Sequence, residues 1–421
     1  MNERLLQYIW QFSFYNSANL VTTCGKPVRV INHGTWNHDQ GPDFQDAKLV
    51  IDGQTWVGSV EMHLRTSDWF RHAHEHDPKY RNVILHVVWI HDETPSLPFP
   101  TLELHDRISK LMLDKYAGLM SSTDKLPCHA ILQLPGELKL LAWKERLVAE
   151  RLEERSGKVL EMLKATGGHW EEVFWRMIAR SFGNGVNSDA FEQIASCIPL
   201  KILAKHRSQL IQVEALLLGQ AGIIDKEFND KYPVLLRREY EFLRKKYRLS
   251  KNHFPLNYLR MRPANFPAIR LAQLAALICK SHSIFSMIRE ADDVKMVKQL
   301  FEVQANDYWS YHYRPDEESG YLVKKTGEQL VNNIITNTVS VMLHAYGRMH
   351  DDAGLTQKAI RWLLEIPAER NRITAVFRET PFTNDSAFDS QGLLQLKQQY
   401  CDRKRCLECA VGSHILRDHQ L

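Results

Sequence analysis

The pattern of apolar residues changes near residue 125, and this change most constrains how the 421-residue chain folds. Before it, short β-branched runs alternate with turns. After it, apolar residues recur at steps of three and four, as in residues 138–165, which is typical of amphipathic helices. We therefore expect an α+β protein. An N-terminal α/β domain with a mixed sheet (1–125) precedes a large all-helical domain (126–395), and a cysteine-containing tail (396–421) packs back on the fold.

Composition and charge bound the class of protein. Hydrophobic residues make up 44% of the chain and charged residues 25%, which is ordinary for a globular protein. The net charge of +4 permits an anionic partner such as nucleic acid without demanding one. We find no run of 18 apolar residues and no signal peptide, so we expect a cytoplasmic protein without a membrane partner. The sequence indicates neither protein partners nor an oligomeric state.

Short elements follow one another in the first 120 residues. The turn at Asp52–Gly53 is a preferred hairpin dipeptide, and the apolar run at 82–90 is typical of a buried central strand. The expected order is a helix at 2–16, a strand at 28–32, a hairpin with strands at 48–53 and 55–64, a short helix or ordered loop at 68–77, a strand at 82–90, an edge strand near 97–104 and a helix at 106–120.

Acidic groups accompany this hairpin although strands disfavour them. Asp43 precedes its first strand, Glu61 lies inside the second, and His63 follows two residues later. Alternate strand residues share a face, so Glu61 and His63 point the same way, and Asp43 can reach that face from the neighbouring strand. We expect this face, with Val57 and Ser59, to face solvent. The opposite face, which we expect to pack on the core, carries Trp56, Gly58, Val60 and Met62.

Two carboxylates on adjacent strands can hold one hard divalent cation, Mg²⁺ or Mn²⁺. Such a cation activates water and offsets charge on a phosphate, and a neutral imidazole can act as a base. We hypothesise that Asp43 and Glu61 hold the metal and that His63 orients water. Glu3 on the first helix is a candidate additional ligand. In the alternative, Asp43 simply ends a turn and Glu61 faces solvent.

The order of helix, three strands, helix and strand, with Pro42–Asp43 and then Glu61-Met62-His63, resembles the PD-(D/E)xK nuclease superfamily over about residues 1–120. The resemblance implies a nuclease-like α/β domain and a divalent-metal-dependent phosphodiesterase acting on nucleic acid. His63 stands where the superfamily has lysine. A non-catalytic nucleic-acid-binding or scaffold protein with a degenerate nuclease fold is therefore the alternative.

A histidine run follows the hairpin, in which His72, His74 and His76 alternate before Asp77. Zinc accepts nitrogen ligands, so a second alternative is a zinc-dependent hydrolase built on these three histidines. An intermediate interpretation places His74 and Asp77 as metal ligands at the rim of the Glu61 site. The simplest interpretation is a polar helix or loop in solvent. We expect His86, inside the apolar strand, to be a core histidine.

Three cysteines crowd the C-terminal tail, as Cys401, Cys406 and Cys409 in a C-x₄-C-x₂-C pattern. A fourth ligand must come from elsewhere; Cys128 is the first candidate, and Cys24 or His414 are others. We expect Zn²⁺ or an iron–sulfur cluster here, the alternative being reduced, partly buried thiols. One upstream and three C-terminal cysteines are similar to the [4Fe–4S] arrangement of some helicase- and CRISPR-associated nucleases, and this resemblance implies a cluster.

Arginines gather around a double-proline turn in the helical region, as Arg260, Arg262 and Arg270. Guanidinium groups suit phosphate, so these residues are a candidate contact with a nucleic-acid backbone. The alternative is a buried network that pins the turn.

Several motifs together resemble a family of bacterial proteins of unknown function over nearly the full chain. They are GPDF (41–44), VEMH (60–63), RMRPANFP (260–267) and the cysteine pattern. The resemblance implies no activity.

Overall fold

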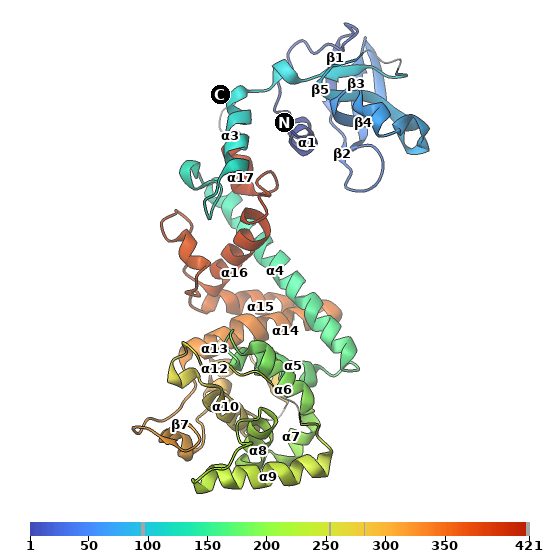
Figure 1. The fold of residues 1–421 in the computed structure, drawn as a ribbon. Coiled ribbons are helices and arrows are strands. Elements are labelled where there is room, and N and C mark those ends of the chain that lie inside the picture. Colours follow the sequence, from blue (N-terminus) through green and yellow to red (C-terminus); the bar gives the residue numbers. More distant parts are fainter. Residues whose placement is uncertain (94–96, 252–253, 282, 418–421) are drawn as a thin grey trace. The chain divides into compact units, whose positions relative to one another are not determined.

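The computed structural model describes residues 1–93, 97–251, 254–281 and 283–417 (Figure 1). The chain divides into two compact units. Unit 1 comprises Met1–Trp143 and Leu396–Leu421, and unit 2 comprises Lys144–Gln395. An N-terminal region with a mixed sheet thus precedes a predominantly helical region, which confirms the predicted α+β class.

Unit 1 is built on a six-stranded sheet in the order β1-β3-β4-β5-β6, with β2 paired to β3. The hairpin and its neighbours β1 and β2 are antiparallel, whereas β4, β5 and β6 run parallel. The sheet is therefore mixed. Its strands are β1 (Val28–Asn32), β2 (Thr35–Trp36), β3 (Phe44–Ile51), β4 (Gln54–Arg65), β5 (Val83–Ile90) and β6 (Thr101–Glu103).

Local sequence accounts for the hairpin and for the first helix. Asp52 and Gly53 have φ angles of 53° and 77°, the left-handed conformation that a two-residue hairpin turn requires. α1 (Glu3–Gln11) begins where the Asn2 side chain accepts a hydrogen bond from the Leu5 backbone N–H. It ends before the expected residue 16 because Ser13 adopts a left-handed conformation, with φ 58°.

The core of unit 1 lies between α1 and one face of the sheet. Leu5, Leu6 and Ile9 of α1 join Val60 and Met62 of β4 in one buried cluster. The later helices of this unit are α2 (Asp68–Arg71), α3 (Lys110–Ser121) and α17 (Ala410–Arg417), and α4 (Glu137–Ala165) begins in it. α17 packs against α3, so residues that are 300 positions apart in the chain lie side by side (Figure 1).

Unit 2 is helical apart from a small two-stranded sheet. Its further helices are α5 (Trp170–Phe182), α6 (Ser188–Cys197), α7 (Leu200–His206), α8 (Leu210–Gln220), α9 (Lys231–Tyr247), α10 (Pro267–Lys280), α11 (Ile284–Glu290), α12 (Val294–Phe301), α13 (Glu328–Ile334), α14 (Ser340–Met349), α15 (Ala353–Glu365) and α16 (Ala387–Gln395). The small sheet pairs β7 (His312–Arg314) with β8 (Glu317–Glu318).

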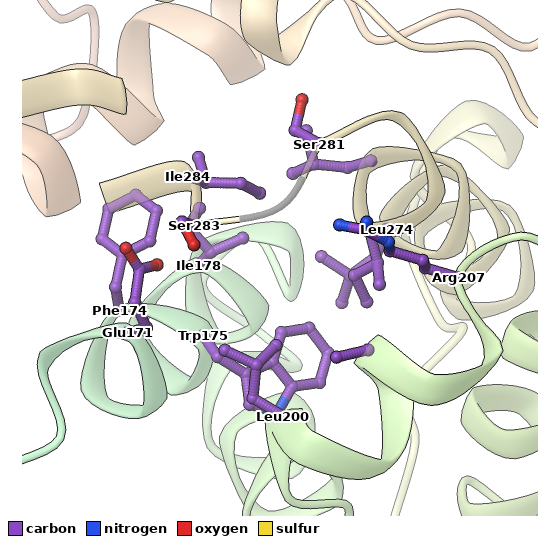
Figure 2. Close-up of a pocket in the computed structure, with 13 residues that line it drawn as sticks. Glu171, Phe174, Trp175, Ile178, Leu200, Arg207, Leu274, Ser281, Ser283 and Ile284 are labelled. Carbon is purple, nitrogen blue, oxygen red and sulfur yellow. The ribbon is translucent and has the colours of Figure 1, made fainter. Parts of the chain in front are cut away.

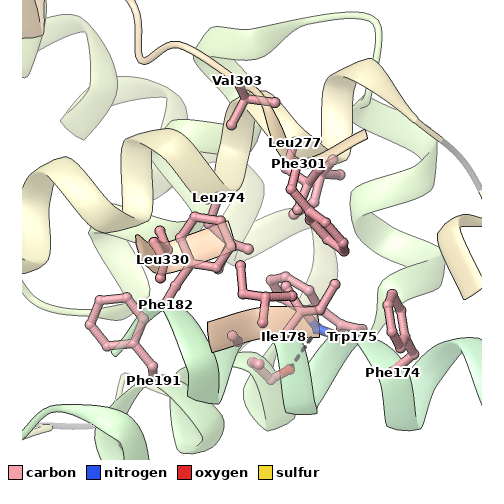
Figure 3. Close-up of a cluster of buried hydrophobic side chains, with 14 of the residues drawn as sticks. Phe174, Trp175, Ile178, Phe182, Phe191, Leu274, Leu277, Phe301, Val303 and Leu330 are labelled. Carbon is pink, nitrogen blue, oxygen red and sulfur yellow. Dashed lines mark hydrogen bonds between the residues drawn. The ribbon is translucent and has the colours of Figure 1, made fainter. Parts of the chain in front are cut away.

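Aromatic side chains of α5 lie at the centre of this unit (Figure 3). Phe174 and Phe182 are fully buried, and the Trp175 indole N–H donates to the carbonyls of Ala195 and Ile198 at 3.2 and 3.1 Å. The apolar face of α5 therefore packs against the helices that surround it.

Among the described residues, no single helix has the length and apolar character needed to cross a membrane. α10 and α11 reach that length and composition only as a pair bent by 67°.

Candidate functional site

The strand register of the hairpin brings Asp43 beside Glu61. Phe44 of β3 pairs with Val60 of β4, so Asp43 lies next to Glu61 just before β3 begins. The Asp43 backbone N–H donates to Glu61 Oε2 at 3.0 Å, and the Met62 N–H donates to Asp43 Oδ2, also at 3.0 Å. Each carboxylate is thus held by the backbone next to the other one.

α1 contributes two further side chains to the surroundings of Asp43 and Glu61. Gln7 Nε2 donates to Asp43 Oδ1 at 2.7 Å, and Glu3 lies one turn earlier on the same helix face. Burial raises the pKa of both Asp43 and Glu61 to about 8, and the charge of Glu3 contributes in the same direction. The charge of Glu61 further raises the pKa of Asp43. Without a cation these two carboxyl groups therefore retain protons near neutral pH, and a bound cation would favour their ionised form.

Histidines from three segments meet Glu61 on the same side of the sheet. The parallel pairing of β4 with β5 places His86 directly beside Glu61. His63 Nδ1 lies 2.9 Å from His86 Nε2, and His63 Nε2 lies 3.1 Å from His72 Nδ1. Glu61 Oε1 is 3.5 Å from His63 Nε2 and 3.3 Å from His74 Nε2.

The polar face of β4 is buried, which corrects the expectation that it faces solvent. Ser59, Glu61 and His63 are only 7%, 5% and 1% exposed, whereas Trp56, expected in the core, is 46% exposed. The reason is the segment that follows β4, comprising α2 and two short 3₁₀ helices, η1 (His74–His76) and η2 (Pro78–Asn82). It folds back over this face of the sheet. Trp56 lies instead near the hairpin turn, two residues beyond the start of β4.

Aromatic rings from the covering segment complete the enclosure. Trp69 of α2 packs edge-on against His63 and His86, with ring centroids 6.4 and 5.6 Å apart. Tyr80 stacks on His74 with centroids 3.9 Å apart. These contacts fix the imidazole planes and keep the site partly shielded from water.

Burial decides the protonation of the two central histidines. Together with the neighbouring imidazoles, it lowers the pKa of His63 to about 2 and that of His86 to about 3. Both rings are therefore neutral at pH 7. His86 Nδ1 is buried without a hydrogen-bond partner among the described residues. An unpaired N–H costs more than an unpaired lone pair, so the favoured tautomer has the His86 Nε2–H donating to His63 Nδ1.

This tautomer directs the proton of His63 outward. With Nδ1 accepting, His63 carries its proton on Nε2, which faces Glu61 Oε1 and His72 Nδ1. His86 thereby sets the orientation of the His63 ring. In metal sites, a hydrogen bond to the second ring nitrogen commonly orients an imidazole in this way.

The donor set fits a divalent metal ion. Ligand nitrogens of His63, His72 and His74 all lie within 4.8 Å of one another. Glu61 Oε1 adjoins two of these imidazoles, and Asp43 lies beside Glu61. Oxygen donors suit Mg²⁺ and Mn²⁺, whereas imidazoles suit Zn²⁺ and other transition metals. The site can therefore hold a metal by carboxylates, by imidazoles or by both.

Two residues of the histidine run are not gathered into this group. His76 is exposed. Asp77 caps η2, where its side chain accepts a hydrogen bond from the Lys79 N–H at 2.9 Å. Gln7 and Tyr80 contribute to the site without having been singled out from the sequence. Only the spacing of Gln7, one helical turn after Glu3, could have suggested its role.

A second cluster joins the C-terminal cysteines to Cys128. Four thiols lie close enough together that the charge of one, if ionised, would raise the pKa of another. They are Cys128, Cys401, Cys406 and Cys409. Cys406 and Cys409 are buried, and Cys128 packs against the same apolar cluster as Cys406. Burial raises the pKa of Cys406 to about 12 and that of Cys409 to about 11, so without a metal these thiols are neutral. The remaining cysteines of the chain lie apart from this group in sequence, and Cys24 is exposed.

The arginines near the double-proline turn separate into two kinds. Arg260 and Arg262 are exposed. Arg270 is buried in α10, where its guanidinium donates to Gln273 Oε1 at 2.9 Å and to Asn265 Oδ1. Its planar group thus ties the turn to the helix.

A largely apolar cavity of about 180 Å³ lies in unit 2 (Figure 2). Phe174, Trp175 and Leu274 line it. Glu171, at its edge, accepts hydrogen bonds from the backbone N–H groups of Phe285 and Ser286 at 3.2 and 2.9 Å. This carboxylate therefore caps the start of α11.

Comparison with known families agrees with the resemblance drawn from the motifs. The model of a family described as a protein of unknown function, DUF2851, matches residues 3–372. The chain belongs to the DUF2851 family. The matched range includes the Asp43–Glu61 pair and the histidines, and it ends before the three C-terminal cysteines of this DUF2851 protein. No curated protein and no solved structure matches the chain.

Proposed function

We propose that this DUF2851 protein is a divalent-metal-dependent phosphodiesterase that acts on nucleic acid. The observation that carries the proposal is the reciprocal hydrogen bonding of Asp43 and Glu61, in which each carboxylate accepts from a backbone N–H beside the other one. Burying two like charges together is costly, and a bound cation would offset that cost. Functional sites are where such arrangements concentrate.

The donor chemistry supports a cation here. Asp43 and Glu61 would hold it through their carboxylate oxygens, with Glu3 and His74 nearest to complete the shell. When bound, a divalent cation supplies charge to the scissile phosphate and lowers the pKa of a water molecule. Each backbone hydrogen bond uses only one oxygen of its carboxylate, so the other oxygen can bind the cation.

His63 is suited to orient the attacking water. It is neutral, and the interaction with His86 fixes its ring. In the favoured tautomer its Nε2–H points outward, where it can donate a hydrogen bond to this water. His63 occupies the position of the lysine in the PD-(D/E)xK motif but lacks its permanent charge. Arg71 lies close enough for its charge to lower the pKa of His63, and it is a permanent cation available to a phosphate at the exposed rim.

A zinc-dependent hydrolase is the second candidate, and the proximity of three imidazoles favours it. The triad that the geometry supports is His63, His72 and His74, with His63 in place of His76 of the sequence hypothesis. Zinc would require the other tautomer of His63, in which its Nδ1–H donates to His86 Nε2 and its Nε2 is free to bind the metal. Zinc sites with three protein ligands and an open position are typical of hydrolases.

Hydrolysis of labelled single- and double-stranded DNA and RNA, with Mg²⁺, Mn²⁺ or Zn²⁺, tests both candidates. We expect Asp43→Asn to reduce turnover at least about 100-fold, because even residues that only orient metal ligands cost about 10–100-fold. Asp46→Asn is the matched control. It lies in β3, three residues after Asp43, is exposed, and has a φ of 57°, which asparagine tolerates.

The metal dependence separates the outcomes. Activity with Mg²⁺ or Mn²⁺ that Asp43→Asn removes supports the phosphodiesterase. Zinc bound by wild type and lost in His72→Ala, with Asp43→Asn still active, supports the zinc hydrolase instead. Salt-dependent nucleic-acid binding without turnover under any metal would overturn both candidates and favour a non-catalytic binding protein.

A further inference from the structure

The C-terminal segment, residues 396–417, lies against α1, which precedes the sheet in the chain, and α3, which follows it. Tyr8 of α1 hydrogen-bonds Ser413 Oγ at 2.8 Å, and Arg4 pairs with Glu408. On α3, Lys115 Nζ donates to the Ile415 carbonyl at 3.2 Å. The Arg417 guanidinium stacks over Phe12, 4.5 Å from the ring centroid. The segment thus contacts α1 along most of its length.

α1 also contacts the Asp43–Glu61 pair. Gln7 donates to Asp43, and Glu3 acts electrostatically on both Asp43 and Glu61. Tyr8, which contacts the C-terminal segment, directly follows Gln7 in α1. A shift of α1 that breaks the contact with Ser413 therefore also moves the Asp43 partner.

The four thiols are placed where they hold this segment. Cys401 ends a π-helix (Leu396–Cys401), a rare conformation that is frequent at functional sites. Cys409 directly precedes α17, and its sulfur accepts hydrogen bonds from the backbone N–H groups of Val411 and Gly412. Such donors, at a helix N-terminus, stabilise a thiolate.

Close backbone packing at Gly412 preserves the arrangement. A Cβ at this position would lie 2.2 Å from the Cys406 carbonyl oxygen. Glycine therefore lets α17 approach the peptide of Cys406, which brings Cys406 and Cys409 to one side of the segment.

We propose that Cys128, Cys401, Cys406 and Cys409 bind one thiophilic metal centre, and that this centre holds the C-terminal segment on α1 and so positions the Asp43–Glu61 pair. Only the last clause rests on the proposed function. Four thiols, two of them buried and two half-buried, come from segments more than 270 residues apart in the chain. They have no structural need to converge, whereas a metal centre requires it.

Charge balance is met by the surroundings of the cysteines. Metal binding deprotonates the thiols and releases their protons to solvent. Lys397 lies close enough to act on Cys401, and Lys404 on Cys406. These cations, with the two backbone donors to Cys409, offset the negative charge of the thiolates.

The spacing of the sulfur atoms points to a centre with more than one metal atom. Among the residues that the structure describes, the cysteines do not form a group of three with sulfur atoms mutually within 4.8 Å. A tetrahedral zinc ion with bonds of about 2.3 Å draws its sulfur ligands to about 3.8 Å from one another. A [4Fe–4S] cluster spreads them more widely, because each cysteine binds a different iron atom. We expect iron and sulfide.

Metal analysis of the full chain, purified without oxygen, tests the centre. We expect iron and acid-labile sulfide, with visible absorbance, in wild type. Cys409→Ser should lose most of it, and the matched control Cys24→Ser, which removes an exposed thiol of the same unit, should keep it. Zinc in place of iron, lost in the same variant, retains the centre and overturns only the spacing argument. Wild type without metal or sulfide overturns the proposal.

A second experiment tests the link to the carboxylate pair without measuring turnover. Mn²⁺ binding to the full chain is followed by calorimetry in wild type, Cys409→Ser and Tyr8→Phe. Tyr8→Phe leaves all four thiols in place but removes the hydrogen bond to Ser413. We expect weaker Mn²⁺ binding in both variants and retained cysteine-bound metal in Tyr8→Phe.

The outcomes distinguish the failures. Unchanged Mn²⁺ affinity in both variants overturns the link while leaving the metal centre standing. Mn²⁺ binding that Asp43→Asn abolishes, in a wild type that hydrolyses none of the substrates, overturns the proposed function and leaves both the centre and the link intact. A Cys409→Ser chain that does not fold is replaced by Tyr8→Phe, which still tests the link.

Discussion

Glu214 illustrates, at the scale of one residue, what burial does to a carboxyl group that no metal site explains. It is fully buried in α8 of unit 2, where it accepts hydrogen bonds from the Tyr232 hydroxyl and the Trp309 indole N–H. Burial raises its pKa from 4.5 to about 7, and the two hydrogen bonds only partly oppose this. The folded state therefore holds the proton more tightly than the unfolded chain.

A pH dependence of stability follows from this raised pKa. The stabilisation is fully present below pH 4.5 and is lost as the pH rises through about 7. Its slope is at most about 1.4 kcal/mol per pH unit. We expect the free energy of unfolding of wild type to fall relative to Glu214→Gln across this range. Urea titrations at several pH values, followed by tryptophan fluorescence, measure it.

The exposed Glu145 of α4 provides the control, since Glu145→Gln alters a carboxylate of the same unit in contact with solvent. A wild-type profile parallel to that of Glu214→Gln from pH 4.5 to 8 would contradict the assignment.

At the scale of elements, close contacts between helices depend on single glycines. Gly219 of α8 faces Tyr240 of α9, and a Cβ there would lie 2.1 Å from the Tyr240 ring. Gly157 of α4 has open space around it. The same substitution therefore has opposite expected effects at the two positions.

We expect Gly219→Ala to destabilise the protein by about 1–3 kcal/mol, because a methyl group must displace a buried ring. Gly157→Ala should stabilise it by about 0.5–1 kcal/mol, because alanine loses less backbone entropy in a helix. Chemical denaturation of both variants checks the pair. Equal shifts in the two variants would refute the tight α8–α9 contact.

Elements whose cause is local were predictable from the sequence. The hairpin follows from Asp52–Gly53 and alternating side chains, and its register then brings Asp43 next to Glu61. The environment of Glu61 was not predictable in this way. Its burial requires the α2–η2 segment to fold over β4, and its contact with His86 requires a parallel pairing between strands separated by that segment. Periodicity within a strand shows which residues share a face, but not what covers that face.

The cysteines show the same limit over a longer range. The C-x₄-C-x₂-C spacing identified three members of one group from a few neighbouring residues. The convergence of Cys128 on them depends on the docking of the C-terminal segment on α1 and α3, which no short pattern encodes.

At the scale of the whole molecule, unit 1 is made from two separate stretches of chain, whereas unit 2 is one continuous stretch. Each unit has its own buried cluster. Contacts that stabilise one cluster are therefore expected to act mainly on the unfolding of that unit.

We expect two transitions in calorimetric unfolding, each responding to its own variant. Cys409→Ser should lower the transition of unit 1, because it removes a ligand of the proposed metal centre that anchors the C-terminal segment. Gly219→Ala should lower that of unit 2. Cys24→Ser is the control for unit 1 and Gly157→Ala for unit 2. A single transition that moves equally with Cys409→Ser and Gly219→Ala would show that the units unfold together.

The split composition of unit 1 has a consequence for synthesis on the ribosome. The carboxylate pair and the histidines emerge early in translation, but three of the four thiols emerge only after all of unit 2 has been made. Unit 2 can fold during translation before the C-terminal segment of unit 1 has been synthesised. Under the proposed link, the Asp43–Glu61 pair therefore reaches its final arrangement only after α17 has been synthesised.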